Sequence, residues 1–148
     1  MLGTRLVFLL LAFLLSFAVS QPLDMLLGGV AEVLPGAAQG WLFLAALFLS
    51  SAAQFFAAGV LFTVLSGLSW KKAAVWTVLG TAAINFLCAG PAALSTGYLF
   101  TELASVAGAA RAILSAAAGV YGCWWLEQRE LAPWVDQARA MILSMIGQ

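Results

Sequence analysis

Histidine is absent from this 148-residue chain, and charged residues are scarce, at 8% of the total. Without histidine the chain lacks the commonest general base and the commonest protein ligand of transition metals. Only two cysteines occur, Cys88 and Cys123, and neither belongs to a CxxC motif or a cysteine–histidine cluster. These absences exclude the usual zinc and iron–sulfur sites, so we expect neither a metal nor a cofactor.

The sequence also lacks the motifs of several common enzyme families. It has no GxxxxGK[ST] loop, no GxSxG elbow and no dinucleotide-binding fingerprint. Six lysines and arginines balance six aspartates and glutamates, so the net charge is zero and there is no basic surplus for nucleic acid. We therefore predict no catalytic residues, no enzymatic activity and no nucleic-acid partner.

Apolar sequence is what the chain has in abundance. Hydrophobic residues make up 64% of it and the mean hydropathy is +1.05, whereas soluble domains carry about 25% charged residues. A membrane-spanning helix needs about 20 mostly apolar residues. Three segments clearly meet this requirement, namely Trp41 to about Ser66, Ala73 to about Leu99 and about Leu103 to Leu126.

The apolar run at the N-terminus allows two interpretations. A short basic start precedes it and Ala18-Val19-Ser20 resembles a cleavage site, so residues 1–20 form a signal peptide in the first interpretation. In the second, an uncleaved span runs from Leu6 to about Leu23 or beyond. Residues 24–41 contain two acids, four glycines and a proline. We expect this stretch to connect the first two spans across the outer face.

The placement of the cations predicts the topology. Every connection that carries a cation falls on one side of the predicted spans, and the positive-inside rule makes that side cytoplasmic. Without cleavage, residues 1–126 are expected to form an all-α, antiparallel four-helix membrane bundle with both termini in the cytoplasm. Cleavage would leave three spans. The cations concerned are Arg5, Lys71, Lys72, Arg129 and Arg139.

Residues 127–148 differ from the spans, because apolar and polar side chains alternate there at helical spacing. Pro133 suits the first turn of a helix. The pattern predicts an amphipathic helix lying on the cytoplasmic membrane surface. The alternative is a helix that packs against the bundle or against a partner subunit.

A few polar residues fall inside the predicted spans. Gln54, Asn85 and Ser115 are placed to form hydrogen bonds between helices, or to line a path for a substrate or ion. Arg111 lies about eight residues into the last span, where a charge usually snorkels to the surface, pairs or contacts an anion. Gly90-Pro91 predicts a kink.

Small residues at four-residue spacing predict where the helices touch, because close approach drives helix association in lipid. Cys123, beside two tryptophans near the cytoplasmic end, is either a packing residue or a candidate for S-acylation. The stripes are Ala46, Ser50, Gln54 and Ala58 in one span, Gly80, Thr81, Asn85, Cys88 and Ala89 in the next, and Gly108, Ala112, Ala116, Gly119 and Cys123 in the last.

Five short motifs occur in a fixed order along the chain: Asp24–Val30 (DMLLGGV), Gln39–Trp41 (QGW), Ser69-Trp70, Thr81–Ala89 (TAAINFLCA), and Tyr121-Gly122 followed by Arg129. The ordered set resembles the spans of MAL-type MARVEL-domain proteins, over residues 24 to 129. The resemblance implies a tetraspan proteolipid that organises membrane domains or acts in vesicle trafficking. It implies membrane lipids and self-association as partners.

The residues themselves leave a second function open. A small bacterial-type channel, a transporter or a subunit of a membrane complex would use the intramembrane polar residues Gln54, Asn85 and Arg111. A membrane-embedded enzyme would need converging acids, bases or metal ligands, and the spans lack them.

Overall fold

The computed structural model describes residues 2–33, 36–96, 106–129 and 132–146, with side chains described except at 31, 37, 84–96, 106–108, 132, 133, 135 and 146. Over the described residues the chain is helical with no strand, which confirms the all-α fold class. The helices are α1 (Leu2–Val33), α2 (Ala37–Ser66), α3 (Trp70–Thr96), α5 (Val106–Gln128) and α6 (Ala132–Ile146).

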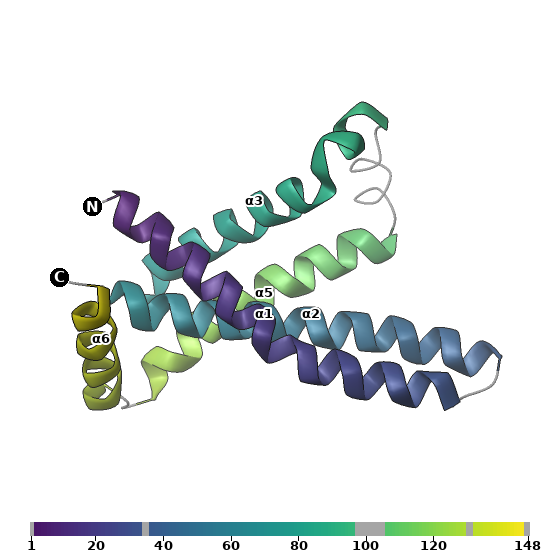
Figure 1. The fold of residues 1–148 in the computed structure, drawn as a ribbon, viewed down its shortest axis with the longest axis horizontal. Helices are drawn as coiled ribbons and strands as arrows, with labels where there is room; N and C mark the ends of the chain where they lie inside the picture. The colour runs from purple at the N-terminus through teal and green to yellow at the C-terminus, as the bar shows by residue number, and fades with distance from the viewer. Residues whose placement is uncertain (1, 34–35, 97–105, 130–131, 147–148) are drawn as a thin grey trace.

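Helix α2 is the centre of the arrangement, because it contacts each of the other four helices in the described part of the chain. Helices α1 and α2 form a long hairpin whose closed end projects beyond the rest of the molecule (Figure 1). Helices α3 and α5 pack on the other half of this hairpin and diverge from it, while α6 lies across its base (Figure 1). The start of α1 and the end of α6 lie at that same base (Figure 1).

Two helices are long and apolar enough to cross a membrane, namely Leu2–Val30 within α1 and Ala38–Ser66 within α2. Only 28% of the most apolar window of each is buried, whereas a core helix of a soluble protein would be mostly covered. Large apolar side chains such as Leu14, Met25 and Trp41 are at least 70% exposed. A continuous apolar surface of this kind marks a membrane or protein interaction site.

The connection between the first two helices is much shorter than the sequence predicts. Helix α1 continues through Asp24 and the Gly28-Gly29 pair, and α2 begins at Ala37, before Trp41. The expectation of a long connection over residues 24–41 was therefore wrong. Hydropathy measures the preference of a segment for lipid, whereas a helix requires only residues whose backbones tolerate helical dihedral angles. Asp24 and Glu32 are therefore accommodated in α1, where both side chains are exposed. Gly36 makes the turn at φ 62° and ψ −132°, a conformation open essentially to glycine.

The remaining predicted segments agree closely with the helices. Helix α3 begins three residues before the predicted Ala73, α5 ends two residues after the predicted Leu126, and α6 covers most of the predicted amphipathic tail. Helix α3 remains helical through Gly90-Pro91, whose side chains lie outside the described set.

The N-terminal segment contributes directly to the core. Phe8, Leu9, Ala12 and Phe13 of α1 are buried, and the Phe13 ring meets the Phe55 ring of α2 edge-on, with 5.7 Å between centroids. A Cβ on Gly80 of α3 would lie 2.7 Å from the Phe13 ring. Because Gly80 has no side chain, α3 can approach α1 at this point.

Candidate functional site

Helices α2 and α5 touch through their backbones at a glycine crossing formed by Gly59, Gly119 and Gly122. A Cβ on Gly59 would collide with the Gly119 carbonyl, whose carbon would lie 3.0 Å away. A Cβ on Gly122 would collide with the Phe56 carbonyl, with 3.2 Å to its carbon. Such close approach replaces the hydrophobic driving force that is missing between helices in lipid.

Cys123 fills the centre of this crossing and is fully buried. Its thiol donates to the Gly59 carbonyl oxygen, with 3.5 Å between Sγ and O, and its sulfur lies 3.6 Å from the Thr77 hydroxyl of α3. The thiol thereby joins three helices. A buried, enclosed sulfur favours the packing interpretation of Cys123 over the S-acylation interpretation.

Hydroxyl side chains at the helix contacts bond to their own helices. Thr63 donates to the Gly59 carbonyl oxygen at 2.8 Å, Thr77 to that of Ala73 at 2.9 Å, and Ser16 to that of Phe13 at 2.8 Å. Local bonds of this kind satisfy a polar group without a solvent partner. The buried hydroxyls are therefore compatible with a membrane interior, where an unsatisfied polar group is costly.

The intramembrane polar residues singled out from the sequence lie on three helices. Gln54 of α2 and Arg111 of α5 are partly buried, and Ser115, one turn after Arg111, is buried. Among the described side chains, no hydrogen bond joins Gln54 to Ser115 and no carboxylate pairs with Arg111. The Asn85 side chain lies outside the described set. The proposed polar cluster is thus described only in part.

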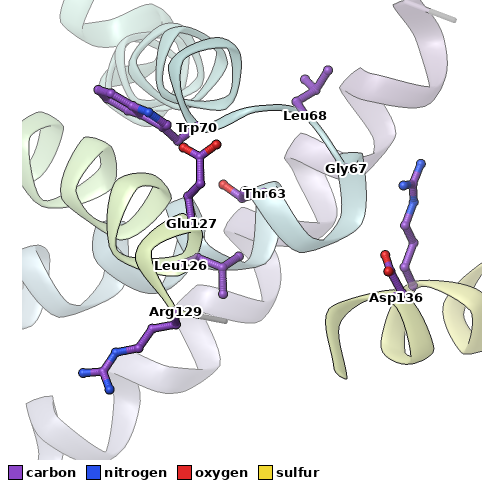
Figure 2. Close-up of a pocket in the computed structure, with 9 residues that line it drawn as sticks. Thr63, Gly67, Leu68, Trp70, Leu126, Glu127, Arg129 and Asp136 are labelled. Carbon is purple, nitrogen blue, oxygen red and sulfur yellow. The ribbon is translucent and has the colours of Figure 1, made fainter. Parts of the chain in front are cut away.

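A pocket of about 270 Å3 opens at the base of the hairpin, where the end of α2, the start of α3, the end of α5 and α6 meet (Figure 2). It is distant in sequence from the intramembrane polar residues and differs from them in character, because charged side chains line it. The lining residues are Thr63, Gly67, Leu68, Trp70, Leu126, Glu127, Arg129, Asp136 and Arg139.

Arg139 connects α6 to the end of α2. Gly67 ends α2 in the left-handed conformation at φ 59°, and its N–H donates to the Thr63 carbonyl oxygen at 3.0 Å. The guanidinium of Arg139 lies against Gly67, so that a Cβ there would be 2.6 Å from the Arg139 Cζ. A cation at this point interacts favourably with the negative, C-terminal end of the α2 dipole. The buried Nε of Arg139 has no hydrogen-bond partner.

The other charged residues of the pocket differ in orientation. Figure 2 shows the Glu127 side chain extending from α5 toward Trp70, and Asp136 rising from α6. Arg129 points away from Glu127 in that view, and its guanidinium stacks over the Trp125 ring, 5.0 Å from the centroid. No ion pair joins any of these described carboxylates and cations.

No motif in the sequence predicts this pocket. Its residues come from four helices, and their convergence depends on the way α6 folds back onto α2. The nearest signal is the clustering of cations in the connections that the sequence predicts to be cytoplasmic, and this clustering predicts topology rather than a pocket. The glycine crossing was found in part, because Gly119 and Cys123 belong to a predicted stripe whereas Gly59 and Gly122 do not.

Comparison of the chain with protein-family models, with curated proteins and with solved structures finds no match. Among the described residues, no three carboxylate or thiol groups gather to hold a metal ion. The function must therefore be argued from the surface, the helix contacts and the pocket.

Proposed function

We propose that this chain is a non-enzymatic, multi-pass membrane protein that organises the lipids around it, in a domain-forming or vesicle-trafficking role. The observation that carries the proposal is the apolar surface of α1 and α2. Each helix is long enough to cross a bilayer and yet buries only 28% of its most apolar window. A surface of this extent is stable only against lipid or against another membrane protein. The resemblance to MAL-type MARVEL proteins leads to the same function.

Retention of the N-terminal segment forms part of the proposal. A signal peptide would be removed from the protein, yet here Phe8, Leu9, Ala12 and Phe13 belong to the core cluster. Removal of residues 1–20 would expose their partners, including Phe55 of α2. These contacts support four spans, in the order α1, α2, α3 and α5, with α6 at the surface.

The distribution of charge supports a cytoplasmic position for both termini. Arg5 lies near the start of α1, and Lys71 and Lys72 lie in the first turn of α3. The starts of α1 and α3 lie toward the base of the hairpin, where α6 also lies (Figure 1). The acids Asp24 and Glu32 lie toward its closed end, in the second half of α1. By the positive-inside rule, the base faces the cytoplasm.

Helix α6 has the two faces that its proposed surface position requires. Ile142 and Leu143 pack on the core, whereas Trp134, Met141 and Met145 are 65–82% exposed. The exposed residues recur at helical spacing on the outer side. We propose that this side inserts into the cytoplasmic membrane surface. In this proposal the tail both lies on the membrane and packs against the bundle.

The decisive experiment is partitioning of the purified full chain in phase-separated giant vesicles that contain sphingomyelin and cholesterol. Flotation with liposomes first tests membrane insertion. We expect the protein to be enriched in the ordered phase relative to an unrelated four-span protein of similar size. Equal partitioning of the two proteins would overturn the lipid-organising role, and failure to float would overturn the membrane assignment.

A channel or complex subunit is the second candidate, and the environment of Arg111 favours it. This cation is partly buried in α5 and pairs with no described carboxylate, as expected for a contact with a permeating anion. Anion flux in proteoliposomes that falls in Arg111→Gln and Asn85→Leu but not in Lys72→Gln would establish this function. Flux equal to that of empty liposomes would exclude it.

A further inference from the structure

The pocket at the base of the hairpin has a mixed charge pattern that the proposed function does not use. We propose that it binds the phosphoethanolamine headgroup of a phospholipid, with the phosphate at Arg139 and the ammonium at Glu127. The inference rests on the proposed membrane topology, which places the pocket at the cytoplasmic surface where lipid headgroups lie.

The size of the pocket suits a headgroup. Its volume is about 270 Å3, whereas a water molecule occupies about 30 Å3 in the liquid and drug-sized ligands take pockets of roughly 300–1,000 Å3. The pocket is therefore large for isolated waters and small for a bulky ligand. It is open to the surface, as a headgroup tethered to acyl chains requires.

Arg139 supplies the phosphate-binding half. Its guanidinium is held against Gly67 at the end of α2, and its buried Nε has no hydrogen-bond partner. A buried donor without a partner is costly, and arginine binds phosphate oxygens through paired N–H groups. Asp136, three residues earlier on α6, forms no ion pair with Arg139. Nε itself is too buried to contact a ligand, whereas the terminal N–H groups of Arg139 form no hydrogen bond or ion pair with the described residues and remain available to an anionic group.

Glu127 supplies the ammonium-binding half. The Glu127 side chain extends toward Trp70 (Figure 2) and is exposed, without an ion pair among the described residues. A carboxylate accepts hydrogen bonds from a primary ammonium. The Trp70 ring already has the Lys71 ammonium 5.9 Å from its centroid, so the carboxylate of Glu127 alone carries this half. The quaternary ammonium of phosphocholine has no N–H to donate, so this half predicts selectivity for ethanolamine.

The charge balance distinguishes this site from a simple anion site. Two carboxylates, Glu127 and Asp136, line the pocket together with Arg139 and Arg129, and Arg129 is already engaged with the Trp125 ring. An acidic headgroup would meet repulsion from two carboxylates and attraction from one available arginine. A zwitterionic headgroup satisfies both signs of charge.

The test is the thermal stability of the purified full chain in maltoside micelles, titrated with dioleoyl lipids that carry phosphoethanolamine, phosphocholine or phosphoglycerol. A ligand that binds only the folded protein raises its Tm. We expect the phosphoethanolamine lipid to raise Tm most, and soluble phosphoethanolamine to compete with it. Glu127→Gln and Arg139→Gln should each weaken binding by roughly tenfold or more, as loss of a charged hydrogen bond predicts.

Lys72→Gln and Glu32→Gln are the matched controls, because they make the same charge changes at exposed positions outside the pocket. Both should bind like the parent. Equal stabilisation by phosphoethanolamine and phosphocholine lipids would overturn the proposal. So would phosphoglycerol or inorganic phosphate binding that survives Glu127→Gln, or failure of the soluble headgroup to compete. Flotation of the same preparation separates such a result from failure of the membrane assignment.

Discussion

At the scale of single residues, the contact between α2 and α5 depends on side chains that are missing. Gly59, Gly119 and Gly122 bring two backbones together, and the Cys123 thiol fills the space that remains. Within a bilayer, lipid tails are as apolar as leucine, so helices associate through packing and short polar contacts. The crossing therefore has to be tight, and a single methyl group is enough to disturb it.

Gly59→Ala is expected to destabilise the protein by about 1–3 kcal/mol, because the added Cβ collides with the Gly119 backbone and helices must shift apart. Gly29→Ala is the control, since a Cβ there meets nothing within 4 Å. It should be neutral or stabilising by up to about 1 kcal/mol, because alanine has a higher helix propensity than glycine. Unfolding by SDS in mixed micelles measures both; equal effects would contradict the glycine crossing.

Cys123 should resist thiol reagents in the folded protein, because its sulfur is buried and contacts Gly59 and Thr77. In a Cys88→Ala background, we expect maleimide labelling only after denaturation in SDS. The same background with Lys72→Cys provides the exposed control, which should label at once. A hydroxylamine-sensitive acyl group on Cys123, detected by mass spectrometry of protein isolated from membranes, would refute the packing role.

At the scale of elements, α6 is fixed to α2 by a cap and an arginine. Gly67 adopts φ 59°, and Arg139 lies against it while Ile142 and Leu143 reach the core. The C-terminal end of α2 thus forms part of the surface on which α6 packs. This arrangement couples the position of the tail to the integrity of the α2 C-terminus.

Gly67→Ala should cost about 1–3 kcal/mol, since alanine is disfavoured in the left-handed region and its Cβ meets the guanidinium of Arg139. The steric part should vanish when Arg139 is also replaced by alanine. A double-mutant cycle measured by unfolding is therefore expected to show coupling between the two sites. Strict additivity would mean that α6 does not rest on Gly67.

Elements that carry a strong local signal could be predicted from the sequence. The all-helical fold follows from the long apolar runs and α6 follows from apolar periodicity, and contacts elsewhere in the chain change neither signal. The length of α1 could not be predicted in this way, because hydropathy falls at Asp24 and Glu32 although the backbone stays helical through them. Hydropathy indicates whether a segment prefers water or lipid, and it does not indicate the conformation of the backbone.

Features that join distant segments were the hardest to predict. The Gly59–Gly119 contact and the pocket require the register of α2 against α5 and the docking of α6. A stripe of small residues shows which face of a helix another helix can approach closely. It does not show which residues of that other helix make the contact. The selection of Ala58 without its neighbour Gly59 illustrates this limit.

At the scale of the whole molecule, the distribution of charge and the core position of α1 support the proposed four-span arrangement. We expect mass spectrometry of protein isolated from membranes to find an N-terminus at Met1 or Leu2. The physical reason is the burial of Phe8, Leu9 and Phe13 against the later helices. A mature protein that begins at Gln21 would contradict four spans.

Topology can be tested with single cysteines in a background without the native pair, using Cys88→Ala and Cys123→Ala. Lys72→Cys should react with an impermeant maleimide only after the membrane is permeabilised. A tag at the C-terminus should become accessible under the same condition. Asp24→Cys should react from the outer face, because it lies toward the opposite end of α1 from Arg5. Labelling of both positions from the same side would contradict the proposed orientation.

The length of the hairpin has a consequence for the bilayer itself. Each apolar helix of the α1–α2 pair has 29 residues and measures about 44 Å at the usual rise, against a hydrocarbon thickness of about 30 Å. Tilt alone would have to reach roughly 47° to hide this excess, beyond the usual range of about 0–40°. In the proposed membrane topology, the hairpin is therefore mismatched to a thin membrane. A thicker, sterol-rich membrane reduces the mismatch, so thickness alone is expected to sort this protein among cellular membranes.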